Sequence, residues 1–226
     1  MKLMIDQSVL FFNKTEQWRG EYFNHPNWHP NTRIMKQIKI DHLDKSQRIR
    51  DDISAIKALA KHYSKEITYC SYSELIGEHW RSNLDTNATY ILDYSKFENL
   101  ECPIDRSYLT PVPLSDMASK EKFVAFIKLL LQRPSDFWAT SSWAVNLTPF
   151  HMQCLKSFDD FRAVCKSVDD NHLPDLFHLW TTWCHNLDGF LTMDYKLIRL
   201  YENTLNTPTV LGKPISPSGI LKSVTA

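Results

Sequence analysis

The sequence predicts an α/β fold in which helices pack against a mostly parallel central sheet. Two short apolar runs, residues 2–6 and 189–193, lie near the two ends of the chain and are typical of strands buried on both faces. Between them, strand-like and helix-like segments alternate, which favours parallel strands joined by helices. The 226 residues, 43% of them hydrophobic, are enough to bury a large core.

Strands are predicted where β-branched, aromatic and apolar residues follow one another without helical spacing. The first run, Lys-Leu-Met-Ile-Asp at residues 2–6, begins the sheet and ends on Asp6. The run Phe-Leu-Thr-Met-Asp ends on Asp194 in the same way. Further strands are predicted at residues 66–70, 89–93 and 208–211.

Helices are predicted where apolar residues recur at intervals of three and four. Ile49, Ile53, Ile56 and Leu59 show this spacing within residues 45–64. The other predicted helices cover residues 71–80, 117–133, 150–166 and 173–186, a short segment after Asp194, and a last segment that begins at Ser216-Pro217. Residues 13–32 are predicted to be irregular, because two prolines there bar a regular helix.

Composition narrows the class of protein. The formal net charge is zero, so charge gives no support to non-specific nucleic-acid binding, which depends on neutralising phosphates. Five scattered cysteines, an odd number without a CxxC pair, fit neither a disulfide scaffold nor a zinc ribbon. Without a signal-like region at the start or an apolar stretch of about 20 residues, we expect a cytoplasmic protein with no membrane segment.

Four acidic residues stand at predicted strand ends or in the first turns of predicted helices: Asp6, Glu74, Asp175 and Asp194. Carboxylates are the ligands that Mg²⁺ and Mn²⁺ prefer, and several of them packed together repel one another unless a cation is present. Each residue also has a simpler interpretation, since acids cap helices and offset the helix dipole. The residues alone leave both interpretations open.

The local context of these acids resembles the PIN-domain nuclease family. The resemblance rests on Ile-Asp6-Gln-Ser8, on Tyr-Ser-Glu74-Leu after a strand, and on Asp175-Leu-Phe-His178 opening a helix. That helix leads directly into Phe-Leu-Thr192-Met-Asp194. The closing Ile-Ser-Pro followed by an apolar helix is also similar to the end of such a domain. The match is most specific over residues 173–197.

The resemblance implies one PIN-like domain over residues 1–226, a three-layer α/β/α sandwich with probable insertions at about 13–44 and 95–165. It implies a metal-dependent endoribonuclease that hydrolyses RNA phosphodiester bonds with Mg²⁺ or Mn²⁺. The metal-binding and catalytic acids would be Asp6, Glu74, Asp175 and Asp194, with Ser8 and Thr192 as supporting hydroxyls. Glu78, one turn beyond Glu74, is the alternative ligand. An inhibitory protein partner would follow if the protein is the toxin of a toxin–antitoxin pair.

Two other functions are compatible with the same residues: a PIN-like binding protein without catalysis, and a phosphatase with an acidic metal site. The phosphatase is disfavoured because the position two residues after Asp6 is Ser8 rather than a second acid. His178 is expected to face the core rather than a substrate phosphate. Trp28, Trp138 and Trp143 lie in irregular polar segments, where core packing is favoured over stacking on bases. A homodimer is compatible with the sequence.

Overall fold

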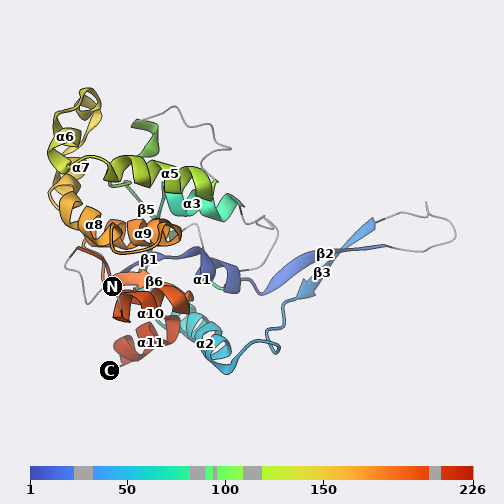
Figure 1. Cartoon of the computed structure of the whole chain (residues 1–226). Coiled ribbons are helices and arrows are strands. Elements are labelled where there is room, and N and C mark those ends of the chain that lie inside the picture. Colours follow the sequence, from blue (N-terminus) through green and yellow to red (C-terminus); the bar gives the residue numbers. More distant parts are fainter. Residues whose placement is uncertain (23–32, 82–89, 94–95, 109–118, 204–209, 226) are drawn as a thin grey trace.

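A five-stranded, entirely parallel sheet forms the centre of the computed structural model, which describes residues 1–22, 33–81, 90–93, 96–108, 119–203 and 210–225 (Figure 1). The strand order is β5-β4-β1-β6-β7. The strands are β1 (Lys2–Ile5), β4 (Thr68–Tyr72), β5 (Glu98–Leu100), β6 (Gly189–Leu191) and β7 (Pro214–Ile215). The predicted α/β class with a mostly parallel sheet is therefore confirmed.

Helices cover both faces of this sheet, in an arrangement compatible with three α/β/α layers (Figure 1). One face packs mainly against α2 (Gln47–His62) and α11 (Pro217–Thr225). The other packs against α5 (Lys120–Leu131), α8 (Phe158–Cys165) and α9 (Leu173–Cys184). The remaining helices described are α1 (Gln7–Phe12), α3 (Ser73–Arg81), α6 (Ser135–Thr140), α7 (Pro149–Leu155), α10 (Tyr195–Asn203) and the short 3₁₀ segments η2 (Arg106–Tyr108), η3 (Ser142–Asn146) and η4 (Asp170–His172). Within the described ranges no helix combines the length and the apolar character that crossing a membrane requires.

The apolar run of β1 explains why the sheet has two cores. Side chains alternate between the two faces of a strand. Met4 therefore joins the core beneath α9, while Leu3 and Ile5 join the core beneath α2, and all three are buried. In β6, Phe190 and Leu191 divide in the same way. A strand with helices on both sides needs this nearly continuous hydrophobic sequence.

The prediction of an irregular segment at residues 13–32 is wrong over its described part. Residues Glu16–Tyr22 form strand β2, which pairs in antiparallel register with β3 (Arg33–Lys39). This ribbon extends away from the body of the protein (Figure 1). The prolines that suggested irregularity, Pro26 and Pro30, lie outside the described residues. Neither strand shows a clear alternation of apolar and polar residues, because the ribbon does not cover a core.

Other predicted elements shift or divide. The strand predicted at 89–93 is reduced to an isolated bridge between Lys14 and Tyr90, with residue 89 outside the described part, and the edge strand is β5 instead. The strand predicted at 208–211 begins outside the described residues, and 210–211 are not extended; the strand here is β7. The helix predicted at 150–166 is two helices, α7 and α8, interrupted at Ser157.

The segment before β7 is held against α9 by a close backbone approach at Gly212. Its amide donates a hydrogen bond of 2.8 Å to the carbonyl oxygen of Leu179. A Cβ at this position would collide with the side chain of Thr182. Only glycine allows the chain to pass so close to the helix.

Candidate metal centre

The sheet has a topological switch point between β1 and β6. From β1 the chain adds β4 and β5 on one side, and then β6 and β7 on the other side. β1 pairs with β4 on one side and with β6 on the other. The amide of Asp6 continues the ladder, donating to the carbonyl oxygen of Leu191 at 2.9 Å. In open parallel sheets, ligands bind outside the carboxyl ends of the strands at such a switch point. Asp6 and Asp194 follow the two strands at this edge, although 188 positions separate them in the sequence (194 − 6).

Two hydroxyl groups hold the carboxylate of Asp6. Its Oδ2 accepts hydrogen bonds from Ser8 Oγ and, at 2.6 Å, from Thr192 Oγ1. Ser8 Oγ accepts from the amide of Met193 at 2.9 Å, so each hydroxyl is itself oriented by the backbone after β6. Burial raises the pKa of Asp6, and the hydrogen bonds from Ser8 and Thr192 oppose that rise. None of these donors carries a positive charge.

Asp194 has both of the roles that its sequence position allows. Its Oδ1 accepts hydrogen bonds from the amides of Lys196 at 2.8 Å and Leu197 at 3.1 Å, which caps the N-terminus of α10. Its own amide donates to Thr192 Oγ1 at 2.9 Å. Asp194 also lines the same depression as Asp6. These hydrogen bonds fix the backbone of Asp194 and the orientation of its carboxylate.

Asp175 reaches the site from the first turn of α9. Its pKa is raised to about 6, chiefly by burial, with His178 lowering it and the carboxylates of Asp6, Asp194 and Glu78 raising it. The imidazole of His172, one turn earlier, lies with Nδ1 3.7 Å from Asp175 Oδ2. Like charges raise one another's pKa, so this shift is consistent with the carboxylates lying near one another.

Together these acids line a shallow depression of about 330 Å³ at the carboxyl edge of the sheet. Its walls combine acidic, polar and apolar side chains: Asp6, Gln7, Ser8, Phe11, Asp175, Asp194 and Leu197. We call this depression the acidic pocket. Three of the four acids predicted from the sequence therefore meet at one place, coming from β1, α9 and β6.

The fourth predicted acid, Glu74, has a different environment. Its carboxylate is buried and forms two parallel bonds with the guanidinium of Arg106, from Nε to Oε1 at 2.8 Å and from Nη2 to Oε2 at 2.6 Å. Arg106 in turn lies over the ring of Phe123 at 5.2 Å. Burial raises the pKa of Glu74, and the guanidinium opposes the rise. Glu74 does not line the acidic pocket.

Glu78, the alternative weighed from the sequence, lies one turn further along α3 and is coupled to the acidic pocket. Its carboxylate raises the pKa of Asp6 and of Asp175. Its Oε1 lies 3.5 Å from Nε2 of His178, a side chain that is 2% exposed. Glu78 thus acts electrostatically on Asp6 and Asp175, whereas the carboxylate of Glu74 is paired with Arg106, and neither glutamate lines the acidic pocket.

His178 connects Glu78 to the core, and the expectation that it faces the core is confirmed. Its ring stacks on Phe190 at 6.0 Å, and Nδ1 lies 2.7 Å from the hydroxyl of Tyr72. Burial raises the pKa of Tyr72 well above its ordinary value, so the hydroxyl keeps its proton. A nitrogen that faces a carboxylate carries hydrogen, so in the neutral imidazole Nε2 is protonated and Nδ1 accepts from the Tyr72 hydroxyl.

Burial lowers the pKa of His178, but Glu78, Asp175 and Asp6 outweigh that effect and leave the pKa above its ordinary value. Nε2 lies 3.5 Å from Oε1 of Glu78, at ion-pair distance, and is buried without a hydrogen-bond partner among the described residues. A buried donor in this state is costly. A shift of Glu78 on binding of a ligand would satisfy it.

The donor set suits a hard cation, because it consists of carboxylate and hydroxyl oxygens without a thiol. In the part of the chain that the structure describes, no three His, Cys, Asp or Glu side chains are already close enough to hold one ion together. Carboxylates in one pocket repel one another, so a coordination shell needs the cation to draw them together. The residues present fit Mg²⁺ or Mn²⁺ in chemistry and in position along the sheet edge.

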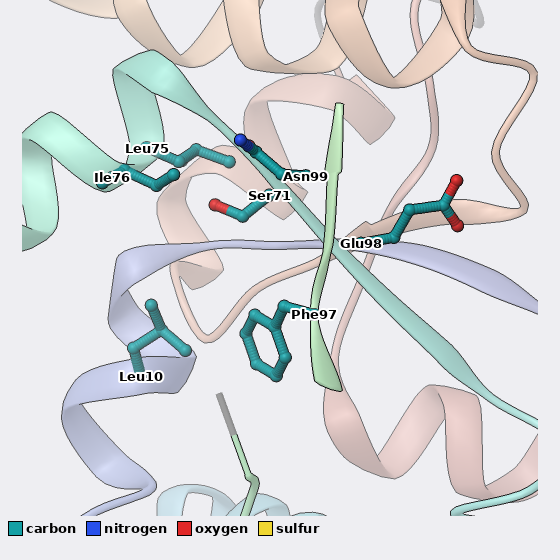
Figure 2. Close-up of a pocket in the computed structure, with 7 residues that line it drawn as sticks. All are labelled: Leu10, Ser71, Leu75, Ile76, Phe97, Glu98 and Asn99. Carbon is teal, nitrogen blue, oxygen red and sulfur yellow. The ribbon is translucent and has the colours of Figure 1, made fainter. Parts of the chain in front are cut away.

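A second, larger pocket, with a volume of about 380 Å³, is lined by Leu10 of α1 and by residues of β4, α3 and β5 (Figure 2). Leu10, Leu75 and Phe97 give it a largely apolar wall, and Ser71, Glu98 and Asn99 contribute polar groups (Figure 2). Consecutive residues of α1 thus serve different pockets, Leu10 the apolar one and Phe11 the acidic one. The apolar pocket has one carboxylate and no cluster of ligands, so the acidic pocket is the candidate for chemistry.

No family model, curated protein or solved structure matches this chain. The chemistry of the acidic pocket is therefore argued from its geometry. Sequence reasoning did not single out Arg106, Tyr72 or Phe11. Nothing in the local sequence signals the first two, since their roles depend on contacts 32 and 106 positions away. Phe11 belongs to an apolar run that is indistinguishable from a buried one.

Proposed function

We propose that this protein is a metal-dependent endoribonuclease of the PIN-like type, with its catalytic centre in the acidic pocket. The observation that carries the proposal is the meeting of Asp6, Asp175 and Asp194 at the switch point of a parallel sheet, from three elements far apart in sequence. Among the described residues, the hydrogen-bond partners of the Asp6 carboxylate are the hydroxyls of Ser8 and Thr192, and no arginine or lysine pairs with it. A cluster of this kind is costly unless an external cation completes it.

The residues that would hold Mg²⁺ or Mn²⁺ are Asp6, Asp175 and Asp194, with Glu78 as the fourth acid in place of Glu74. When bound, such a cation lowers the pKa of a coordinated water and neutralises charge that develops on a phosphate. The chain needs no serine, cysteine or histidine nucleophile for that hydrolysis. The shallow, open form of the pocket suits a polymer that passes across it rather than a small enclosed molecule.

The supporting residues have distinct tasks. Ser8 and Thr192 hold Asp6 in one orientation through hydrogen bonds to its Oδ2, which is the usual role of groups behind a metal ligand. His178, with its protonated Nε2 directed at Glu78, positions that carboxylate and lowers the repulsion among the acids. Tyr72 fixes the tautomer of His178.

An RNA-cleavage assay tests the proposal. Purified protein is incubated with single-stranded RNA and MnCl₂ or MgCl₂, next to the variants Asp6→Asn and Asp194→Asn and the control Asp136→Asn, an exposed carboxylate on α6. We expect cleavage that needs the cation, is lost with EDTA, and disappears in the first two variants but not in the control. Cleavage that persists in Asp6→Asn and Asp194→Asn would contradict the proposal.

The same assay decides between the two glutamates. Glu78→Gln is expected to lose cleavage and keep its fold, because it removes a negative charge that acts on Asp6 and Asp175. Glu74→Gln leaves the charge of the pocket intact and is expected to lower stability first, because Arg106 loses its partner. Cation binding without cleavage of any RNA would favour the alternative of a PIN-like binding protein. An inhibitory protein partner stays a prediction.

A further inference from the structure

One aromatic side chain at the acidic pocket is exposed although its neighbours in sequence are buried. Phe11 is 59% exposed, whereas Val9 and Leu10 in the same short helix are 0% and 5% exposed. Phe11 lines the acidic pocket together with Asp6, Asp175 and Asp194. Single exposed apolar side chains are common on protein surfaces, but this ring lines the same depression as the acids and so offers a ligand there a flat apolar face.

The ring of Phe11 contacts a neighbouring aromatic ring. Phe12 meets it edge-on, with ring centroids 5.1 Å apart and an angle of 89° between the planes. Phe12 is itself partly buried and packs on the core beneath α2. This contact limits the rotation of the Phe11 ring and leaves it with a solvent-facing surface, so a flat ligand meets a surface that is already oriented.

The charges around Phe11 indicate which part of a nucleotide binds there. Asp6, Asp175 and Asp194 repel phosphate groups, and a bound cation would be occupied by the phosphate that reacts. A nucleobase is neutral and flat, and it stacks on aromatic rings irrespective of its sequence identity. Phe11 is therefore suited to the base of a nucleotide next to the phosphate at the acids.

We propose that Phe11 is a base-stacking platform that makes the acidic pocket select single-stranded over duplex RNA. This inference rests on the proposed function, because it takes RNA as the substrate of the acidic pocket. In a duplex each base is already stacked between neighbours, and offering its face to Phe11 requires unstacking and unpairing. In a single strand the face is available, which is how unpaired RNA is commonly recognised.

A binding experiment tests this platform separately from catalysis. Fluorescein-labelled RNA, either a 12-nucleotide single strand or the same sequence in a duplex, is titrated with protein in CaCl₂ and followed by anisotropy. The variants are Phe11→Ala and Phe11→Trp, with Phe137→Ala as the matched control, since Phe137 is an exposed phenylalanine on α6 outside the pocket. Thermal unfolding of each variant checks that the fold is intact.

Phe11→Ala is expected to weaken binding of the single strand by about 5- to 150-fold, the range for loss of one base–aromatic contact. Phe11→Trp is expected to bind at least as tightly as the unchanged protein, and Phe137→Ala to bind equally. Binding to the duplex is expected to be weaker and nearly insensitive to Phe11→Ala. Equal affinity of Phe11→Ala and the unchanged protein for the single strand would overturn the inference.

Single abasic substitutions along the RNA sharpen the test. At the nucleotide that stacks on Phe11, removal of the base and Phe11→Ala are expected to be non-additive, whereas at other nucleotides their effects add. A purely structural role of Phe11 would give additivity everywhere. Failure of the ribonuclease proposal looks different: the unchanged protein would leave RNA uncut with Mn²⁺ or Mg²⁺, whether or not Phe11 affects its binding to the single strand.

Discussion

Asp6 and Glu74 are both acidic residues near the carboxyl ends of neighbouring strands, yet their surroundings are opposite. Glu74 is buried and bound at both oxygens by Arg106. Asp6 is half-buried and bound by the neutral hydroxyls of Ser8 and Thr192. The first carboxylate is paired with a guanidinium inside the fold. The second is held by neutral hydroxyls, and the nearby imidazole of His178 lowers its pKa without forming a hydrogen bond to it in the described structure.

The difference shows how a structural carboxylate is distinguished from a candidate ligand. A carboxylate that is neutralised by an internal guanidinium has no free energy to gain from an external cation. A carboxylate that is oriented by hydroxyls and crowded by Asp175 and Glu78 gains both solvation and relief from repulsion. The following predictions test this comparison.

The largest effect is expected on the Glu74 side. Arg106→Met leaves a buried carboxylate without its partner, which should lower the free energy of unfolding by about 3–5 kcal/mol. Urea denaturation of the unchanged protein and the variant measures the change. The double variant Glu74→Leu with Arg106→Met removes both charges and should recover most of the loss. A single variant that costs less than about 1 kcal/mol would mean that the pair is not a structural one.

The second largest effect is expected from cation binding, which should depend on Asp6 and Asp194. MnCl₂ at 100 times its dissociation constant should stabilise the unchanged protein by about 2.7 kcal/mol, seen as a higher Tm. Asp6→Asn and Asp194→Asn should lose this shift, and Asp136→Asn should keep it. Without cation, Asp6→Asn should be as stable as the unchanged protein or more stable. A full Mn²⁺ shift in Asp6→Asn would place the cation elsewhere.

The pH dependence of stability should carry the signature of Asp175. Its pKa in the folded protein is about 6, above the ordinary value of 3.8, so the folded state holds this proton more tightly than the unfolded state. The corresponding stability is fully present below about pH 4 and is lost as the pH rises through about 6. Without metal, the free energy of unfolding measured from pH 4 to 7 should therefore fall less steeply for Asp175→Asn than for the unchanged protein. Identical slopes would contradict the crowding of these acids.

The smallest expected effect concerns the network behind Glu78. Tyr72→Phe removes the hydroxyl that donates to Nδ1 of His178 and leaves the buried ring in place. The loss of this one hydrogen bond should lower the free energy of unfolding by about 1 kcal/mol. Because His178 then orients Glu78 less well, the apparent Mn²⁺ affinity should fall by about 10-fold. Isothermal titration of Mn²⁺ checks the second effect, and an unchanged affinity would limit Tyr72 to a structural role.

Much of the fold was predictable because local patterns carry it. The helices α2 and α9 follow apolar spacing, and β1 and β6 follow short apolar runs between polar residues. The ribbon of β2 and β3 was not predictable in the same way, because it packs on no core and so has no apolar periodicity. Residues 89–93 have strand-like composition, but the edge of the sheet is taken by β5, whose composition is polar.

The candidate site divides along the same line. The sequence by itself determined that Asp6 and Asp194 end buried strands and that Asp175 begins a helix, because strand ends and helix starts depend on neighbouring residues. Only the tertiary structure decided that Arg106 neutralises Glu74, that Glu78 acts electrostatically on the aspartates, and that Phe11 is exposed. These outcomes depend on which distant groups meet in space, and the free energy of a buried charge or an exposed ring is set by those partners rather than by the local sequence.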